Sequence, residues 1–252
     1  MLNLRHLFER LSRGVVLKKT LPADFGKRPL LVSPEGGGLR FWKQSLNEAD
    51  PMLLQVVRQF IKKGDTVWDV GGNVGLFAFA SAARSASGSV AVFEPDILLA
   101  HLLQKSAALN TDLRLSVFPL AVSDKDGIAR FNIAQRARAT NYLDEGTGST
   151  QTGGIRSTIM VPTIRLDTFL NWFDKPDFIK IDVEGAEHLV FKGMLHILKE
   201  IRPTILCEVS RSNWAFISTI LAEERYKVYD AALLPDLVPA SNPVSNILIL
   251  PA

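Results

Sequence analysis

Three acidic residues stand at or near the ends of apolar segments in this sequence. Asp69 lies in TVWDVGG, Glu94 ends VAVFE, and Asp182 ends FIKID. Carboxylates gathered at one edge of a sheet could attract a cationic group, bind hydroxyl groups or accept a proton. All three chemistries require that these segments be neighbouring strands of one sheet.

A glycine-rich turn follows Asp69 in the segment GDTVWDVGGNVGLF. Gly71 and Gly72 allow the backbone to turn sharply and approach a ligand, and Asn73 tolerates a left-handed conformation. The spacing does not match the Gly-x-Gly-x-x-Gly fingerprint of dinucleotide sites, and the chain has no Gly-Lys-Ser/Thr for a triphosphate. Because the carboxylate of Asp69 would repel a phosphate and attract a sulfonium or amino group, a cationic ligand is favoured.

Glu94 ends the next predicted strand, 23 residues after Gly71. An acidic residue at this place can bind the two hydroxyls of an adenosine ribose, as in dinucleotide folds. Together with the turn it indicates an adenosyl ligand. The alternative is that Asp69 and Glu94 only cap helix N-termini.

Asp182 is followed by Glu184 and Glu187 at the start of a predicted helix. Asp182 and Glu184 are the candidate catalytic residues, because they could orient and deprotonate an acceptor hydroxyl. The alternative is that these carboxylates cap the helix and pair with Lys180, which lies on the same strand face as Asp182. For Glu187 that structural interpretation is favoured.

A histidine base and a metal ion are less favoured at this acid cluster. A helical wheel places His188 on the polar side of its helix, away from the buried face. The cluster together with Asp96 could supply oxygen ligands for Mg²⁺, but nothing in the spacing fixes their geometry, so no metal is predicted.

Apolar segments with strand and helix periodicity alternate from Glu48 onward, which predicts an α/β fold with parallel strands and right-handed crossovers. The predicted strands are 66–70, 89–94, 113–122, 177–182 and 203–209, followed by YKVYDA and NILILP. The predicted helices are 49–62, 74–83, 97–109, 186–198 and 213–224. No helix separates the last two strands, so they are expected to be antiparallel neighbours.

Residues 1–47 are predicted to be an extension and residues 48–252 the main domain. The extension is expected to contain an amphipathic helix near its start and two short strands around Pro34 to Gly38, with Gly36 to Gly38 as turn glycines. Within the domain, the glycine-rich stretch 134–156 is long for a loop and is expected to be a lid over the acceptor site.

The composition is that of a globular protein, with 252 residues, 47% hydrophobic and 22% charged. Its net charge of +3 comes from scattered residues, so no nucleic-acid partner is expected. Cys207 is the only cysteine and lies in an apolar run, which favours a reducing, cytoplasmic location. No apolar run is long enough to span a membrane, but the first helix could serve a homo-oligomer or a membrane surface.

Four segments resemble the FkbM family of class I S-adenosylmethionine-dependent methyltransferases. They are GDTVWDVGGNVGLF, VFEPD with the later Asn110, LAVSDKDG, and FIKIDVEGAEHLVFKG preceded by IRLDTF. The last of these is the most specific to the family. The resemblance implies a Rossmann-like fold with a seven-stranded, mostly parallel sheet, an antiparallel last strand, and helices on both faces.

The resemblance also implies where S-adenosylmethionine would bind. The expected cofactor contacts are Asp69, Gly71, Gly72, Asn73, Glu94, Pro95, Ala121, Ser123 and Asp182, with the segment from Leu120 to Ser123 against the adenine. Glu48, Asn141 and Glu187 are candidates on the acceptor side. The family often has alanine in place of Gly72 and asparagine in place of Ser106, and the second difference affects a polar contact near that helix.

The expected activity is O-methylation of a sugar or a glycosylated or polyketide natural product, a substrate class that comes from the resemblance. An N-methyltransferase and a non-catalytic adenosyl-binding scaffold are the alternatives. A nicotinamide oxidoreductase would need the missing glycine spacing. Methylation of nucleic-acid bases is disfavoured, because no Pro-Pro-aromatic run follows Asp182.

Overall fold

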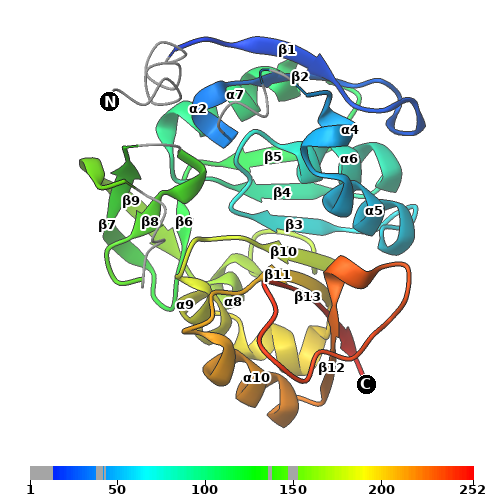
Figure 1. Cartoon of the computed structure of the whole chain (residues 1–252), viewed down its shortest axis with the longest axis vertical. Coiled ribbons are helices and arrows are strands. Elements are labelled where there is room, and N and C mark those ends of the chain that lie inside the picture. Colours follow the sequence, from blue (N-terminus) through cyan, green and yellow to red (C-terminus); the bar gives the residue numbers. More distant parts are fainter. Residues whose placement is uncertain (1–13, 38–41, 43, 136–137, 147–152) are drawn as a thin grey trace, which may run out of the picture.

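The computed structural model describes residues 14–37, 42, 44–135, 138–146 and 153–252. Its central element is a seven-stranded sheet in the order β12-β13-β11-β10-β3-β4-β5 (Figure 1). The strands are β3 Val67–Val70, β4 Val90–Phe93, β5 Leu115–Phe118, β10 Phe178–Ile181, β11 Thr204–Glu208, β12 Tyr226–Asp230 and β13 Asn246–Pro251. All run parallel except β13, which is antiparallel to β11 and β12. The predicted fold class and the antiparallel final pair are confirmed.

Two apolar clusters cover the two faces of this sheet, and successive residues of one strand belong to different clusters. Val67 packs with α5 (Pro51–Phe60), α6 (Leu76–Ser85) and α7 (Ile97–Ala108), whereas Trp68 packs with α8 (Leu166–Phe169), α9 (Glu187–Lys192) and α10 (Trp214–Glu223). Burial on both faces explains why β3, β4 and β10 are almost wholly apolar. Helices therefore lie on both faces, as predicted.

Two predicted helices are divided in the structure. The helix expected at 49–62 is a short α4 (Leu46–Ala49) followed by α5, because Pro51 starts a new helix whose N-cap, Asp50, accepts a hydrogen bond from the Leu53 amide at 3.1 Å. The helix expected at 186–198 ends as α9 at Lys192, and a π-helical turn follows at Ile197–Ile201. No helix in the described part of the chain is long and apolar enough to cross a membrane.

The N-terminal extension contains a hairpin at a different place from the predicted one. Its strands are β1 (Leu17–Thr20) and β2 (Pro29–Val32), and it packs on α7, where Ser106 Oγ accepts a hydrogen bond from the Leu31 amide at 2.8 Å. Pro34–Gly37 forms the short helix α2 instead of a turn. A Cβ on Gly36 would lie 2.8 Å from Val74 Cγ1, so α2 sits directly on the glycine-rich turn. The predicted first helix and the strand expected after Gly38 fall on residues 1–13 and 38–41, outside the described ones.

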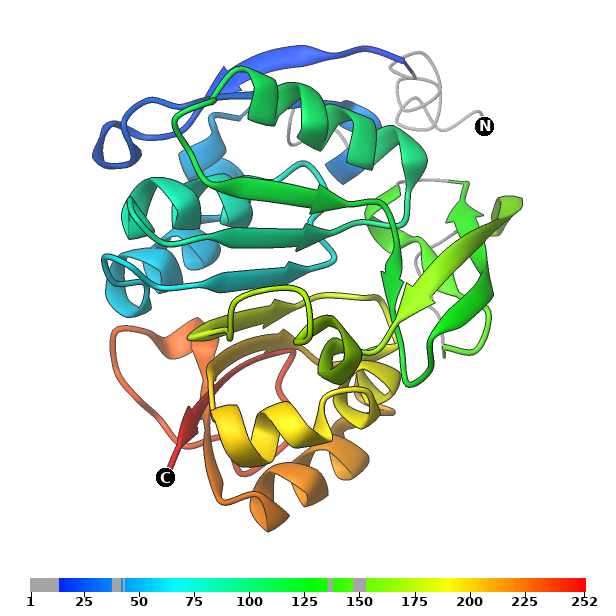
Figure 2. The same cartoon turned by 180° about the vertical axis from the view of Figure 1, so that it is seen from behind.

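A second, four-stranded sheet in the order β6-β9-β7-β8 stands at the carboxyl ends of the central strands (Figure 2). It is formed by β6 (Ala121–Val122), β7 (Gly127–Ala134), β8 (Tyr142–Leu143) and β9 (Ile155–Ile164). The strand predicted at 113–122 is therefore two strands in two sheets. Likewise, the described part of the 134–156 stretch holds β8 and a 3₁₀ turn, η2 (Arg138–Thr140).

An aromatic cluster fixes α8, which carries the IRLDTF segment, to the central sheet. The Phe169 ring lies 5.1 Å from Trp68, 4.8 Å from Phe93 and 4.9 Å from Phe118, with edge-to-face geometry in each case. Edge-to-face pairs of this kind add to the stability gained from burying the rings. The cluster fixes α8 to β3, β4 and β5 on the face opposite α6.

We expect Phe169→Ala to lower the free energy of unfolding by about 3 to 5 kcal/mol, because it empties a site in contact with several rings. Urea denaturation measures this. Trp172→Ala is the matched control, since Trp172 is 69% exposed and its loss should change stability by less than about 0.5 kcal/mol. Equal effects of the two substitutions would contradict the packing described.

Candidate functional site

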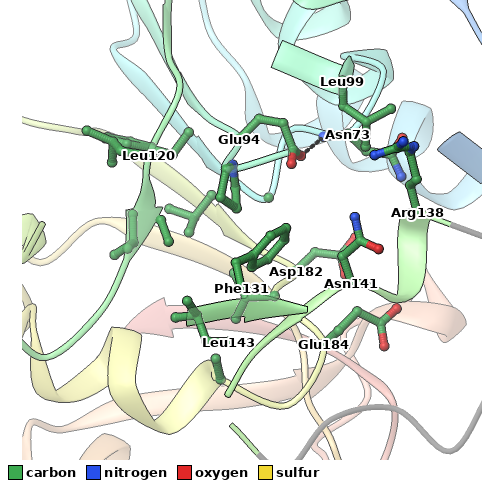
Figure 3. A pocket seen from close by; sticks show the side chains of 18 of the residues that line it. Asn73, Glu94, Leu99, Leu120, Phe131, Arg138, Asn141, Leu143, Asp182 and Glu184 are labelled. Atoms are coloured by element: carbon green, nitrogen blue, oxygen red, sulfur yellow. Dashed lines mark hydrogen bonds between the residues drawn. The ribbon is translucent and has the colours of Figure 1, made fainter. Parts of the chain in front are cut away.

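A cavity opens beyond the carboxyl ends of the central strands (Figure 3). It contains about 590 Å³ of space, including the part open to solvent at its mouth. Its walls are the glycine-rich turn after β3, the end of β4, the segment around β6 and the loop after β10, with Phe131 and Leu143 from the second sheet closing one side. Cavities of this size and position are the usual ligand sites of open parallel sheets.

The glycine-rich turn is held tightly between its neighbours. Gly71 has a φ of 82°, and a Cβ there would overlap the carbonyl oxygen of Asp182. A Cβ on Gly72 would overlap Val92 Cγ1. Asn73 has a φ of 49°, the left-handed conformation predicted for it. The turn thus requires small residues, and it brings the loops after β3 and β10 into contact.

Glu94 connects this turn to the next loop and faces the cavity (Figure 3). Its carboxylate accepts hydrogen bonds from the amides of Asn73 at 2.8 Å and Asp96 at 2.9 Å. Burial raises the pKa of Glu94 to about 8, although the two amides oppose this shift. The N-cap of α7 is Asp96 and not Glu94, because Asp96 Oδ1 accepts from the amides of Leu98 and Leu99.

Asp69 is placed differently from the prediction. It is fully buried, is not among the residues that line the cavity, and forms an ion pair with Lys180 at 3.1 Å. Lys180 also donates to the carbonyl oxygen of Gly71 at 3.0 Å and lies 3.5 Å from Asp182 Oδ2. Burial alone would lower the pKa of Lys180, but the charges of Asp69 and Asp182 raise it, so the ammonium stays charged. The positive charge of Lys180 therefore balances the negative charge of Asp69 inside the protein. This geometry does not support a direct contact between Asp69 and a cationic ligand.

An ion-pair network lies beside the cavity, and two of its members, Arg138 and Asn141, line the cavity. Arg138 donates to Asp96 Oδ2 at 2.6 Å and to Glu35 Oε2 at 3.0 Å, and Asn141 donates to the same Asp96 oxygen at 2.7 Å. Arg156 donates to Glu35 Oε2 at 2.9 Å. The network joins η2 to the start of α7 and to α2, and it uses the carboxylate of Asp96 that was considered as a metal ligand. No group of metal-binding side chains is found among the described residues.

The acid cluster after β10 separates into two kinds of residue. Asp182 and Glu184 line the cavity, and the side chain of Asp182 is 33% exposed. Glu187 is only 2% exposed and accepts hydrogen bonds from the Gly185 amide at 2.6 Å, Ser210 Oγ at 2.9 Å and Asn213 Nδ2 at 2.7 Å. These hydrogen bonds occupy its carboxylate oxygens. Glu187 therefore has a structural role, and an acceptor contact is not supported.

The remaining predicted residues fall inside and outside the cavity. Pro95, Ala121 and Asn141 line it, together with Gly71, Asn73, Glu94 and Asp182. Ser123 and Gly72 do not, although Gly72 lines an adjoining cavity. Glu48 is exposed and forms a capping box with Ser45 at the start of α4, so an acceptor contact there is not supported. His188 packs against Phe216 and does not line the cavity.

Sequence reasoning missed Arg138, which lines the cavity, and Glu35, which accepts a hydrogen bond from it. Glu35 and Arg138 are 103 positions apart and meet only because α2 folds back over the glycine-rich turn. No local pattern in the sequence signals this contact.

The raised pKa of Glu94 has a measurable consequence for stability. The folded protein retains this proton between about pH 4.5 and pH 8, whereas the unfolded chain loses it. The resulting stabilisation is complete below about pH 4.5 and is lost as the pH rises through 8. It amounts to a few kcal/mol at most, since one pKa unit corresponds to about 1.4 kcal/mol.

Glu94→Gln should therefore become more stable relative to wild type as the pH is raised from 5 to 8.5. Urea denaturation at both pH values measures the difference. Glu223→Gln, an exposed change on α10, is the control and should follow wild type at each pH. If Glu94→Gln also followed wild type, Glu94 would have an ordinary pKa.

Comparisons with known proteins show to which family this chain belongs. A family model described as the methyltransferase FkbM domain matches residues 69–229. The hexuronic acid methyltransferase AglP of Haloferax volcanii is 24% identical over 190 residues, which cover 71% of this chain and 74% of AglP. The solved structure of methyltransferase FkbM from Methylobacillus flagellatus KT is 18% identical, with a TM-score of 0.50 over 74% of this chain. That match spans only 43% of the other chain. Because the family model covers more than half of the sequence, including the glycine-rich turn and the acid cluster, this chain belongs to the FkbM methyltransferase family.

Proposed function

We propose that the protein transfers the methyl group of S-adenosylmethionine to a hydroxyl oxygen of a sugar or glycosylated acceptor. The observation that carries this proposal is the cavity in which the glycine-rich turn, Glu94 and Asp182 meet at one edge of the sheet. Family membership supports methyl transfer. The similarity to a hexuronic acid methyltransferase supports a saccharide acceptor.

The residues of the cavity fit an adenosyl group. Gly71 offers bare backbone to the cavity, and the close packing of Gly71 on Asp182 and of Gly72 on Val92 holds the turn at its edge. Glu94 offers carboxylate oxygens to the ribose hydroxyls, and binding there would favour its charged form. Pro95, Leu120 and Ala121 supply apolar surface for the adenine. When bound, S-adenosylmethionine supplies a methyl group that is already activated on a sulfonium.

The protein's task is then to place an acceptor oxygen in line with that methyl group and to remove its proton. Asp182 is suited to the first task, because Lys180 holds it in position while a third of its side chain is exposed. Glu184 lines the same cavity from a residue with a φ of 48°, in the loop that faces the ligand. We assign both to orienting the acceptor hydroxyl.

Our proposal keeps the described residues around η2 as part of the predicted lid. Arg138 and Asn141 line the cavity and are fastened to Asp96. Amine acceptors would use the same cofactor site, so an N-methyltransferase differs from our proposal only in the group methylated.

Cofactor binding is the first test of this proposal. Isothermal titration calorimetry should show that S-adenosylhomocysteine binds at least about tenfold more tightly than NAD, a difference of about 1.4 kcal/mol. Tighter binding of NAD would overturn our interpretation of the glycine-rich turn. Binding of the adenosyl ligand without methylation of any acceptor would leave a binding scaffold.

Methyl transfer is the second test. Protein and methyl-labelled S-adenosylmethionine are incubated with 4-nitrophenyl glucoside, glucuronide and galacturonide and with an amino sugar, and the products are identified by mass spectrometry. We expect an O-methyl product. In Asp182→Asn and Glu184→Gln, turnover should fall by about 10² or more while the affinity for S-adenosylhomocysteine changes less than about tenfold. A collapse of cofactor affinity in Asp182→Asn would instead make Asp182 a cofactor residue.

A further inference from the structure

A second opening lies on the other side of Asp182 from the cofactor cavity, between the start of α5, the ends of β10 and β11, and the start of β13. We call it the acceptor cleft and define it by Asp50, Leu53, Lys180, Asp182, Glu208 and Asn246. It holds about 340 Å³, including space open to solvent, and adjoins a hollow under the glycine-rich turn that shares four of these residues. Asp182 lines the cofactor cavity, the hollow and the acceptor cleft.

Strand register places the cleft in line with the cofactor cavity. Val70 pairs with Phe93 and with Ile181, and Ile181 pairs with Cys207. The residues one position further along these strands therefore form a row across the sheet. From the cofactor side outward, the row is Glu94, Gly71, Asp182, Glu208 and Asn246, the last two being a registered pair.

This row sets how far Glu208 lies from the methyl donor. Neighbouring strands are about 4.8 Å apart. Glu208 therefore lies one strand spacing from Asp182 and two strand spacings from the glycine-rich turn. A ligand in the acceptor cleft can thus contact Glu208 while one of its atoms reaches the region of Asp182.

Resting on the methyl transfer proposed above, we propose that Glu208 is the base that accepts the proton of an acceptor hydroxyl bound in the acceptor cleft. In this step the acceptor oxygen forms a bond to the methyl carbon as the bond between that carbon and sulfur breaks. The sulfonium becomes a neutral thioether, and the hydroxyl proton moves to the carboxylate of Glu208. Exchange with water then restores the base, because Glu208 is solvent-exposed.

The contacts of the neighbouring carboxylates distinguish Glu208 from them. Glu94 is hydrogen-bonded to two amides, Glu187 accepts three short hydrogen bonds, and Asp182 lies beside the Lys180 ammonium. The carboxylate of Glu208, in contrast, forms no hydrogen bond or ion pair with any residue in the described part of the chain. A ligand could therefore bind the carboxylate of Glu208 without breaking an interaction that stabilises the fold.

Electrostatics make Glu208 a stronger base than an ordinary carboxylate. The charge of Asp182 raises the pKa of Glu208 to about 7, against the opposing charge of Lys180. Partial loss of water around the carboxylate in the cleft adds to this shift, although the residue as a whole is exposed. Glu187 from α9 and Asp50 from the start of α5 raise it further. Asn246 faces it from β13 as an uncharged amide. A base works best when its pKa is close to the working pH.

The same charges indicate which acceptor atom is used. Three carboxylates line the cleft beside one ammonium, and Asp69 already shares that ammonium. A carboxylate nucleophile would be repelled there and would have no proton to give. The cleft therefore suits a hydroxyl of a sugar ring rather than the acid group of a hexuronate.

The test compares wild type, Glu208→Gln and the distant control Glu223→Gln with the 4-nitrophenyl glycosides that wild type methylates. We expect kcat of Glu208→Gln to fall by about 10² to 10⁴. The Kd for S-adenosylhomocysteine should change less than about threefold, which also shows that the variant is folded. The control should match wild type in both measurements.

The pH profile provides a readout that a purely structural role would not change. Wild-type kcat/KM should rise with pH through about 7, as the base loses its proton, and this rise should disappear in Glu208→Gln. In Asp182→Asn the residual activity should rise at a lower pH, because the main charge that raises the pKa of Glu208 is gone.

The outcomes separate this inference from the proposed function. If wild type methylates none of the glycosides, methyl transfer to sugars fails and this inference fails with it. If wild type is active and Glu208→Gln retains its kcat and its pH profile, only the role of Glu208 is overturned. A methyl ester of the glucuronide, formed equally by both proteins, would also overturn it.

Discussion

A buried ammonium group is the constraint on which the region around the cavity depends. Lys180 lies in the middle of β10, where a charge is costly unless it is paired. Its three partners are Asp69 on β3, the carbonyl oxygen of Gly71 in the glycine-rich turn, and Asp182 after β10. The need to satisfy Lys180 therefore fixes the turn and the acid cluster relative to each other. A neutral residue at this position would leave two carboxylates facing each other without compensation.

The contact between the loops after β3 and β10 is the geometric counterpart of that charge arrangement. Gly71 packs so closely on the backbone of Asp182 that no side chain fits, and this contact joins the glycine-rich turn to the loop after β10. Methyl transfer depends on the alignment of donor and acceptor, and small displacements are costly. A rigid contact between Gly71 and Asp182 would help to keep a methyl donor and an acceptor aligned.

Local patterns in the sequence were sufficient for the central sheet and for the cofactor edge. Apolar runs buried on both faces identify β3, β4 and β10, and Glu94 and Asp182 stand at their ends. Features that depend on distant partners were not predictable. Asp69 was predicted to attract a cationic ligand because it stands beside the glycine-rich turn. Its ion pair with Lys180 has no local signal, since the two residues are 111 positions apart and meet through strand register. The second sheet was missed because Pro119 separates two short strands that continue in different sheets.

Glu208 illustrates the same limit at the level of function. In the run TILCEV it is typical of the end of a buried strand, and nothing adjacent in the sequence marks it as reactive. Its raised pKa depends on residues of the neighbouring strands. Asp182, after β10, raises the pKa of Glu208, and Asn246 on β13 is uncharged. Carboxylates of the same row thus differ by their partners: amides hold Glu94, an ammonium holds Asp182, and no described side chain holds Glu208. Binding of the donor, orientation of the acceptor and removal of its proton can then be divided among three residues of one chemical type.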